Sequence, residues 1–388
     1  MSETVPVVAL GSGLTALGVV RTLGKAGLTP YLSCKPGDFA GRSRWVRGRV
    51  LHLEESEDPA LLVDGLERHG IHEAVVIGCS DIWVTAASRL PEEARERLHT
   101  SVPAREVLDL LVDKWLFAET LMLLDVPHPR TVAVSGERDL EQADLTGTFL
   151  KPRHSQQFAQ IFHRKALTYE SLEDARAAYR MIADVGLTAV LQEYIPGPPT
   201  EHIFVDGFVD AAGTVKAVLP RRRVRMFPPD FGNSTLMVSV SREEAAGAID
   251  SVTRLLEGIG YRGIFSAEFK RDPRDGQYKI LEVNSRPWWF IGFAAHCGVD
   301  VAPMAYRDAL GLPVAASEGY AVGERCVLLP QEIRAFLYLR RRGEIRFWPW
   351  LRSWFGATAT IFAWDDPLPA IAVPWFVARW RERRVSGR

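Results

Sequence analysis

The sequence has only four cysteines among 388 residues, and no two of them form a CxxC pair. A disulfide framework and a thiolate zinc site are therefore not expected, and a reducing compartment is the simpler interpretation. Long hydrophobic runs are also missing, since no stretch reaches the ~18 apolar residues that a membrane span needs. The acidic N-terminus lacks the basic segment and apolar run of a secretory signal. Together these absences predict a cytoplasmic protein.

Net charge is nearly absent too, because 47 basic and 48 acidic side chains leave a formal charge of −1. This balance excludes a protein that coats nucleic acid through bulk charge. Wholesale disorder is excluded as well, because 47% of the residues are apolar. Lysine is the scarce basic residue, with 8 copies against 39 arginines, so the position of each lysine is informative.

The pattern of apolar runs divides the chain into three parts, and its length favours two or three domains. Residues 1–105 alternate short strand-like runs with helical patterns, which predicts a parallel α/β domain. Residues 106–312 predict an α+β domain of antiparallel strands and helices, beginning with one long helix over residues 106–124. Residues 313–388 are rich in tryptophan and arginine and are expected to form a C-terminal extension.

A glycine-rich turn follows the first predicted strand, with glycines at positions 11, 13 and 18. Such a turn before a helix suits anion binding at the helix N-terminus. The spacing is not the dinucleotide-binding GxGxxG pattern, and a tight turn that only packs is an equally good interpretation. Asp81, at the end of another strand, is either a ligand for a substrate amine or, more simply, a helix N-cap.

Two neighbouring predicted strands carry the densest set of reactive side chains. The first holds Glu268, and the second holds Glu282, Asn284 and Arg286, with a turn at residues 272–276 between them. Side chains alternate along a strand, so the last three share one face, and a hairpin would bring Glu268 opposite them. Carboxylate and amide oxygens suit Mg²⁺, and an arginine beside them can neutralise phosphates. The alternative is a solvated hairpin face with paired charges.

The set Glu268 … Glu282-Val283-Asn284-Ser285-Arg286-Pro287 resembles the metal-binding strand pair of the ATP-grasp superfamily. Three upstream segments match that superfamily in the right order. They are Asp113-Lys114 at a helix, Phe149-Leu150-Lys151-Pro152 on a strand, and Gln192-Glu193-Tyr194-Ile195-Pro196-Gly197 on a later strand. The resemblance extends over residues 1–312, including the α/β domain that precedes the grasp domain in this superfamily.

The resemblance implies a set of residues that bind the nucleotide: Lys114, Lys151, Glu193, Tyr194, Ile195 and Glu201. The two lysines would contact the phosphates, the hinge strand that contains Tyr194 would read adenine, and Glu201 would contact the ribose. It also implies the cofactors ATP and Mg²⁺, with Mn²⁺ as a substitute. Glu268, Glu282 and Asn284 would hold the metal ion, and Arg286 would neutralise phosphates and the charge that develops during the reaction.

The implied architecture is a two-lobed grasp domain over residues 106–312, with a small lobe at about 131–191 and a large lobe at about 192–312. The implied activity is that of an ADP-forming carboxylate–amine ligase, which activates a carboxylate as an acyl phosphate and condenses it with an amine. Its partners would be a small carboxylate and an amine, with no nucleic acid, and a homodimer is compatible with families of this type. One alternative is a grasp-fold kinase or carboxylation component. The other is a nucleotide-binding accessory protein with a membrane-associated tail.

Of two basic regions, one departs from the motifs of the superfamily, and the other adds to them. The loop at residues 152–158 lacks the usual glycines, so Arg153, His154 and two glutamines are candidates to contact phosphate through side chains. In the cluster at residues 221–225, alternation puts the three arginines at 221, 223 and 225 on one face. We expect Arg223 to act on the acidic substrate, whereas a nucleic-acid patch is the rival interpretation.

The tail interleaves tryptophan and arginine, with six of the eleven tryptophans between residues 348 and 380. Aromatic rings beside basic residues suit a membrane surface. Packing against the grasp domain is the favoured alternative, because repeated prolines break the segment and rule out one long amphipathic helix.

Overall fold

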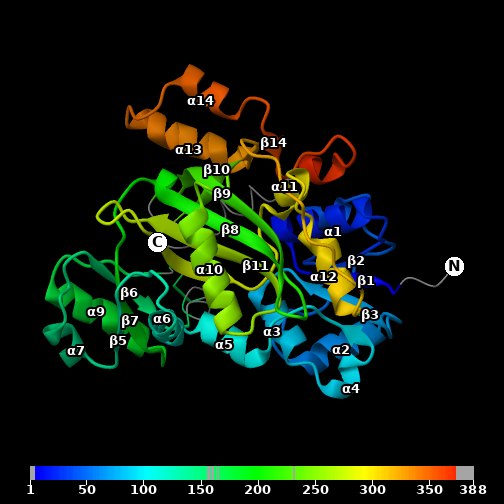
Figure 1. Ribbon diagram of the computed structural model, residues 1–388, viewed down its shortest axis with the longest axis horizontal. Helices are drawn as coiled ribbons and strands as arrows, with labels where there is room; N and C mark the ends of the chain where they lie inside the picture. The colour runs from blue at the N-terminus through cyan, green and yellow to red at the C-terminus, as the bar shows by residue number, and fades with distance from the viewer. Residues whose placement is uncertain are drawn as a thin grey trace.

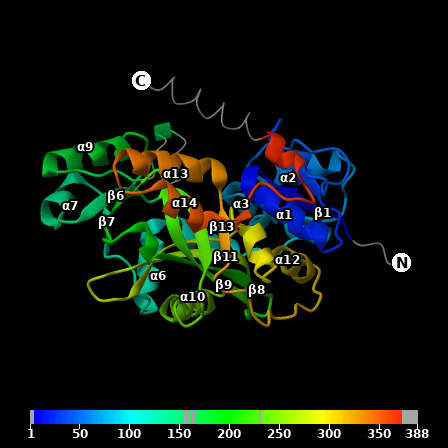
Figure 2. The same ribbon diagram turned by 90° about the horizontal axis from the view of Figure 1, so that it is seen from above.

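The computed structural model describes residues 5–154, 158, 161–162, 164, 166–229 and 232–372 (Figure 1). Within them a 4-stranded, a 3-stranded and a 7-stranded sheet organise the chain. Figure 2 shows the 3-stranded sheet and its helices at one end, the N-terminal helices at the other, and the large sheet between them. The α/β and α+β architecture predicted from the sequence is confirmed. In the described part of the chain, no helix has the length and apolar character needed to cross a bilayer.

The N-terminal sheet is entirely parallel, in the order β2-β1-β3-β4. Its strands are β1 (Val7–Leu10), β2 (Tyr31–Ser33), β3 (Ala74–Gly78) and β4 (Leu98–His99). Its helices are α1 (Gly13–Lys25), η1 (Phe39–Arg42), α2 (Pro59–Glu67), α3 (Asp81–Ser88) and α4 (Glu92–Arg95). Every residue of β1 and β3 is buried, as expected for parallel strands covered on both faces.

The glycine-rich turn before α1 is occupied by a carboxylate of the chain itself. Both carboxylate oxygens of Asp38 accept from the backbone N–H of Gly13, at 3.0 and 3.1 Å. Gly11 adopts a φ of 140°, and a Cβ there would lie 2.9 Å from that of Cys79. The turn therefore packs closely against Cys79, and the carboxylate of Asp38 lies at the positive end of the helix.

The segment predicted as one helix over residues 106–124 forms two helices, so that prediction was wrong. They are α5 (Arg105–Val112) and α6 (Lys114–Leu123). Asp113 separates them, because its side chain accepts from the backbone N–H of Trp115 at 2.9 Å and of Leu116 at 3.2 Å. An aspartate that caps a helix in this way starts a new helix axis instead of continuing the previous one.

The small sheet is antiparallel in the order β5-β7-β6 and is packed with two helices. Its strands are β5 (Thr131–Val134), β6 (Thr148–Pro152) and β7 (Ala189–Glu193), and the helices are α7 (Glu137–Gln142) and α9 (Leu172–Ala183). A short 3₁₀ helix, η2 (Pro199–Glu201), then leads into the large sheet.

The large sheet has the order β12-β11-β8-β9-β10-β13-β14. Its strands are β8 (His202–Val209), β9 (Val215–Phe227), β10 (Asn233–Ser239), β11 (Gly263–Arg271), β12 (Tyr278–Asn284), β13 (Arg325–Val327) and β14 (Thr358–Ala359). The predicted hairpin, β11–β12, is present with antiparallel pairing, and β8 and β9 form a second antiparallel hairpin.

The two faces of the large sheet have different partners. Ile203 and Val205 of β8 share a core with α10 (Ala246–Gly258), α5 and α6. Phe204 and Phe208, on the opposite face, share a core with β1 and α1 of the N-terminal domain. The same core takes in α11 (Ile291–His296) and α12 (Val301–Ala309). The N-terminal domain is therefore bound to one face of the large sheet through a continuous hydrophobic core.

The segment after residue 312 continues the large sheet instead of standing apart from it. Strand β13 pairs antiparallel with β10, and β14 pairs parallel with β13. Between them, α13 (Leu329–Arg341) and α14 (Phe347–Trp354) lie over the β9–β10 end of the sheet, at the top of Figure 1.

A buried ion pair ties this segment to the N-terminal domain. The carboxylate of Asp366, which is 1% exposed, accepts from Arg21 Nε at 2.9 Å, from Ser43 Oγ at 2.7 Å and from the backbone N–H of Arg44 at 2.9 Å. Arg21 also donates to the carbonyl of Ile361 at 2.8 Å. The carboxylate of Asp366 balances the charge of the guanidinium, and acceptors in the same short segment bind its N–H groups.

We expect Asp366→Asn to lower the free energy of unfolding by about 3–5 kcal/mol, because it leaves the buried Arg21 without a counter-charge. The measurement is the urea midpoint of the first unfolding transition. The neighbouring Asp365→Asn is the matched control, since its pair with Lys25 is exposed and contributes about 0–1 kcal/mol. Equal, small shifts in both variants would contradict this account of how the C-terminal segment is held.

Candidate active site

The two glutamates singled out in the sequence lie directly opposite each other. Glu268 of β11 is paired with Glu282 of β12, and Ser266 with Asn284, before a register shift that follows Glu268. Residues directly opposite in an antiparallel pair share a face, with side chains close enough to interact. Two like charges in this arrangement repel each other, so the pair requires positive charge nearby.

Part of that positive charge comes from the protein. Oε1 of Glu268 accepts from Nδ1 of His202 at 2.8 Å and from the guanidinium of Arg223 at 3.0 Å. Burial opposes ionisation, but the charge of Arg223 and the hydrogen bond from His202 outweigh it, and the pKa of Glu268 is lowered to about 2. The carboxylate is therefore ionised at neutral pH. Both hydrogen bonds fall on Oε1, so Oε2 is the oxygen that suits a metal ion.

The second strand presents its polar groups as a linked series. The amide nitrogen of Asn284 donates to Glu282 Oε1 at 3.2 Å, and Arg286 donates to the amide oxygen of Asn284 at 3.3 Å. Arg286 also donates to Oδ1 of Asp81 at 2.7 Å and to Oδ2 at 3.4 Å. The arginine at the end of the series is thus held by the N-terminal domain.

Asp81 is therefore not the helix N-cap that the sequence favoured. The cap of α3 is Ser80, whose Oγ accepts from the backbone N–H of Trp83 at 3.3 Å. Asp81 is the first residue of the helix and directs its carboxylate to Arg286 across the domain boundary. The two side chains of this ion pair are both partly exposed.

The alternate arginines of β9 each meet a different carboxylate. Arg221 is buried against Asp206, to which Ser266 also donates at 2.6 Å. Arg225 donates to Glu332 of α13 at 2.6 Å. Arg223, between them, is the one of the three that contacts Glu268.

The residues expected on the ATP side lie at the junction of the small and large sheets. Nζ of Lys151 on β6 donates to Oε1 of Gln192 on β7 at 2.9 Å. Just beyond β7, Tyr194 is 40% exposed and its ring lies under the ammonium of Lys270 at 4.9 Å, whereas Ile195 is buried. An exposed aromatic side chain next in sequence to a buried apolar one is able to contact a flat heteroaromatic ring.

Two acidic residues of the predicted nucleotide site differ in their surroundings. Glu193 is engaged by Arg274 at 2.7 Å and by the backbone N–H of Arg130 at 3.1 Å, so its side chain fixes the hinge strand. Its backbone N–H is engaged as well, because it donates to the carbonyl of Arg130 at 2.8 Å. Glu201 is the last residue of η2, directly before β8, and its side chain is partly exposed.

The first lysine of the predicted phosphate site begins α6. The backbone N–H of Lys114 donates to the carbonyl of Arg153 at 3.2 Å, and the side chain of Arg153 donates to Asp113 at 2.6 Å. These contacts join the start of α6 to the end of β6, so both predicted lysine-bearing segments meet. Arg153 is thereby occupied by an ion pair, and the glutamines of the loop, with residues 155–157, lie outside the described residues.

Sequence reasoning missed His202, Asp206 and Glu332. The first two alternate along β8 on the face that carries Phe204, so strand periodicity contained the signal once β8 was known to pair with β11. Burial lowers the pKa of His202, which keeps the imidazole neutral and able to donate from Nδ1. Glu332 had no such signal, because it comes from a helix that is distant in the sequence.

The donor set fits Mg²⁺ only if substrate or water completes it. Across the described ranges no group of three or more His, Cys, Asp or Glu side chains is arranged to hold a metal ion. The set consists of two carboxylates and one amide oxygen, which are hard oxygen donors. Mg²⁺ commonly binds one or two carboxylates together with water and substrate phosphates, so the residues fit such an ion.

The chain is similar in sequence to one curated ligase and similar in structure to several solved enzymes. No protein-family model matches the sequence. A D-aspartate ligase of Enterococcus faecium (strain Aus0004) is 24% identical over 330 residues, which cover 79% of this chain and 76% of the ligase. Among solved structures, an L-amino acid ligase from Bacillus licheniformis matches with a TM-score of 0.59 and 15% identity, covering 80% of this chain and 75% of that one.

Two further structures contain ATP or an analogue. Biotin carboxylase from Campylobacter jejuni, in complex with β-γ-ATP, matches with a TM-score of 0.63 and 17% identity, covering 82% of this chain and 74% of that one. Carboxyaminoimidazole ribonucleotide synthase from Aspergillus clavatus, complexed with ATP, matches with a TM-score of 0.63 and 14% identity, covering 84% and 81%.

The chain therefore has the ATP-grasp fold, and the resemblance found in the motifs is confirmed at this level. Its relatives in sequence and structure include ligases for D-aspartate and for L-amino acids. Nucleotide complexes among the neighbours, one of them with MgADP, agree with ATP and Mg²⁺ as the expected cofactors.

The environment of His202 predicts a specific effect of pH on stability. Its pKa in the folded protein is lowered, so the unfolded chain takes up a proton first as the pH falls below about 6.5. This contribution is fully present above that pH and is lost as the pH falls through the folded-state pKa. His202→Gln keeps a donor for Glu268 but cannot be protonated, and we expect its stability to fall less steeply.

The measurement is the urea midpoint of the wild type and of His202→Gln between pH 7.5 and 5.5, a range that spans the ordinary histidine pKa of about 6.5. One buried neutral histidine changes the slope by up to about 1.4 kcal/mol per pH unit. If the urea midpoints of the two proteins changed in parallel with pH, His202 would bind protons equally in the folded and unfolded states. That result would contradict the account of His202 as a buried, neutral donor to Glu268.

Proposed function

We propose that the protein is an ATP-dependent carboxylate–amine ligase that activates a carboxylate as an acyl phosphate and releases ADP. The observation that carries the proposal is the facing pair Glu268 and Glu282, extended along β12 by Asn284 and Arg286. Two facing carboxylates beside an amide oxygen and a guanidinium fit a phosphate-bound Mg²⁺. The ATP-grasp fold and the ligases among its relatives support the same conclusion.

In the proposed reaction, the γ-phosphoryl group passes from ATP to the substrate carboxylate, and an amine then displaces phosphate to form an amide. Mg²⁺, when bound, supplies charge neutralisation for the phosphates. Lys114 and Lys151 hold the phosphates, and the hinge at Tyr194 and Ile195 holds the base. Arg286, oriented by Asp81, and Arg223 neutralise the negative charge that develops on the substrate. No side chain acts as a nucleophile.

One substrate is proposed to be an amino acid. This follows from the D-aspartate ligase and the L-amino acid ligase, which are similar to the chain along most of its length. A site lined by Arg223 and Arg286 agrees with an acidic substrate such as aspartate. The carboxylation alternative is represented by biotin carboxylase among the neighbours, and it predicts that bicarbonate is the acid that is activated.

Glu282→Gln is the variant that tests the site. The Glu282 carboxylate accepts one hydrogen bond, from Asn284, so its loss leaves no buried cation unpaired, unlike the loss of Glu268 next to Arg223. We expect turnover to fall by at least about 100-fold, since even indirect metal contacts are worth 10–100-fold. The unfolding midpoint should stay at the wild-type value. Glu257→Gln, on the exposed surface of α10, is the matched control and should retain full turnover.

The assay is the release of ADP and AMP from Mg-ATP with pools that contain D-aspartate, L-amino acids, small carboxylic acids or bicarbonate. ADP formed with an amino acid pool, together with an amide product, is the expected result. ADP that requires bicarbonate and yields no amide would support the carboxylation alternative. AMP would overturn the acyl-phosphate mechanism, and unchanged turnover in Glu282→Gln would overturn the site.

A further inference from the structure

The C-terminal segment carries an unusual concentration of exposed aromatic side chains. Trp348 is 66% exposed, Phe355 73% and Trp364 90%, and within the described ranges no other aromatic side chain exceeds 60%. Two aliphatic side chains further along, Leu368 and Ile371, are also more exposed than buried. We call these five side chains the C-terminal apolar surface. Single exposed apolar residues are ordinary, but five within 24 residues of one segment are a reason to look for a partner.

Among the tryptophans of this segment that the structure describes, only Trp350 is buried by packing. Trp350 is buried, stacks on Phe336 at 4.2 Å between ring centroids and donates to Glu332 at 2.8 Å. The packing favoured from the sequence therefore applies to Trp350, whereas Trp348 and Trp364 face solvent. Trp375 and Trp380 lie outside the described residues.

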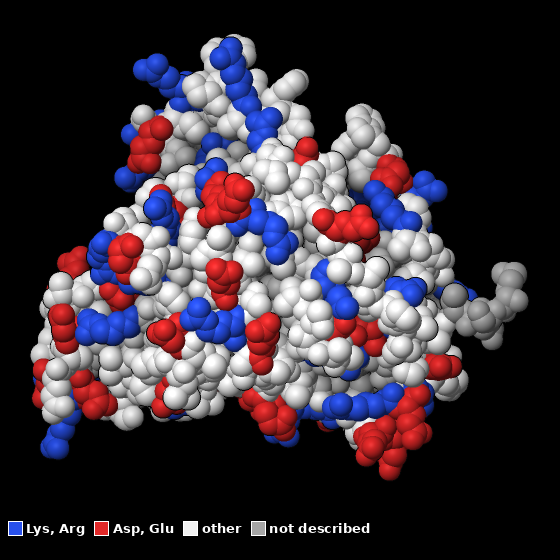
Figure 3. Space-filling model, viewed as in Figure 1, with Lys and Arg blue, Asp and Glu red and all other residues white. Residues whose placement is uncertain are grey.

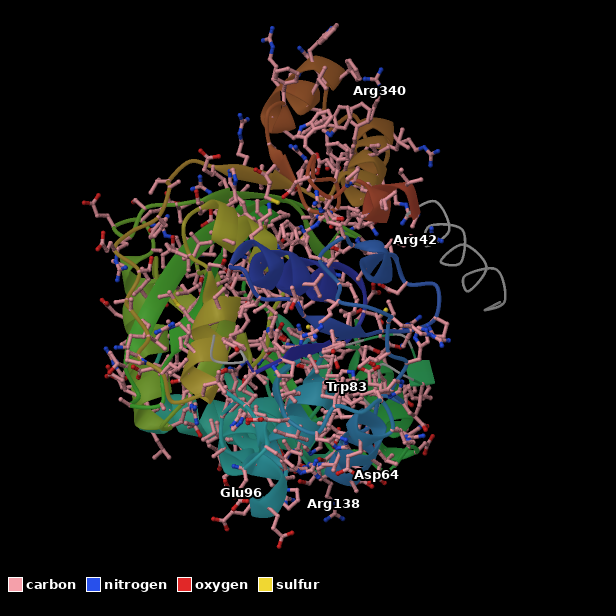
Figure 4. All side chains as sticks on the ribbon, turned by 90° about the vertical axis from the view of Figure 1, so that its right-hand side faces the viewer. Arg42, Asp64, Trp83, Glu96, Arg138 and Arg340 are labelled. Carbon is pink, nitrogen blue, oxygen red and sulfur yellow. The ribbon has the colours of Figure 1, made fainter. Side chains whose placement is uncertain are left out.

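The surface lies in a strongly basic part of the chain. Between residues 333 and 364 there are six arginines, at 334, 340, 341, 342, 346 and 352, and a single acidic residue, Glu344. The two aspartates that follow are engaged elsewhere, Asp365 with Lys25 and Asp366 with Arg21. Figure 3 shows lysine or arginine side chains on the projection formed by α13 and α14, and Arg340 lies at its outer end in Figure 4.

The exposed apolar side chains and the arginines together favour one class of partner. Arginines bind phosphates, and tryptophan and phenylalanine rings lie well at the boundary between headgroups and acyl chains. Nucleic acid would also attract arginines and stack on aromatic rings. The exposed Leu368 and Ile371 have no use in base stacking, but they add apolar area that an acyl boundary can cover. We propose that the C-terminal apolar surface, with its flanking arginines, docks the protein on an anionic lipid membrane.

The segment is held rigidly enough to present these groups. Glu332, fully buried, accepts from Arg225, from Thr235 at 2.6 Å and from Trp350, which fixes α13 and α14 on the large sheet. The pair of Asp366 with Arg21 fixes the other end of the segment. Because the segment is already ordered, binding costs little conformational entropy. The contact is peripheral, since α14 has only 8 residues.

Co-sedimentation of the full chain with vesicles tests the proposal. Vesicles of phosphatidylglycerol and phosphatidylcholine are compared with vesicles of phosphatidylcholine alone, at low and at physiological salt. We expect binding to the anionic vesicles that weakens as salt rises, because arginine attraction to the surface is screened. Binding should be at least about ten-fold weaker for the double variant Trp348→Ser, Trp364→Ser, which removes apolar area from the interface.

Leu123→Ser is the matched control, because Leu123 is 86% exposed on α6, far from this segment in the sequence. It should bind vesicles as the wild type does, and all variants should keep the wild-type urea midpoint. Absent binding, or equal binding by the double tryptophan variant, would overturn the proposal. Binding to a single-stranded oligonucleotide in place of vesicles would assign the surface to nucleic acid. The test does not depend on ligase activity, so its outcome is separate from that of the proposed reaction.

Discussion

The alternate arginines of β9 are the constraint on which the rest of the molecule depends. Each is buried or nearly so, and each requires a carboxylate: Asp206 within the sheet for Arg221, Glu268 across the sheet for Arg223, and Glu332 from α13 for Arg225. Breaking one buried pair costs far more than a surface pair contributes. The three pairs therefore fix the register of β8, β9 and β11 and the position of the C-terminal helix together.

The face of the large sheet that carries these ion pairs also carries the proposed metal ligand. Arg223 is paired for stability with Glu268, which is also the carboxylate proposed to hold a metal ion. The hydrophobic core below it is shared with the N-terminal domain, and Asp81 of that domain holds Arg286. The proposed phosphate site is thus built at the boundary between two domains, where its cations are positioned by carboxylates from both.

Local patterns predicted the parts of the fold and site that depend on neighbouring residues. Alternation along 263–270 and 280–286, with a turn between them, was sufficient to predict that Glu268 lies opposite the polar set of the second strand, whereas its exact partner, Glu282, came from the observed register. Contacts between distant segments had no local signal, as with Glu332 and Asp366. The break at Asp113 was missed because the apolar period continues through it, whereas the capping hydrogen bonds decide the helix start. The roles of the predicted nucleotide residues stay predictions.

Strands β13 and β14 determine where one edge of the large sheet lies. Without them, β10 would end the large sheet with a row of unpaired backbone groups next to buried apolar residues such as Leu236 and Met237. Exposed edges of this kind recruit strands from other chains. The short β13 and β14 move the edge to a strand of only two residues. The segment predicted as a C-terminal extension thus covers the β10 edge of the sheet that carries the proposed site.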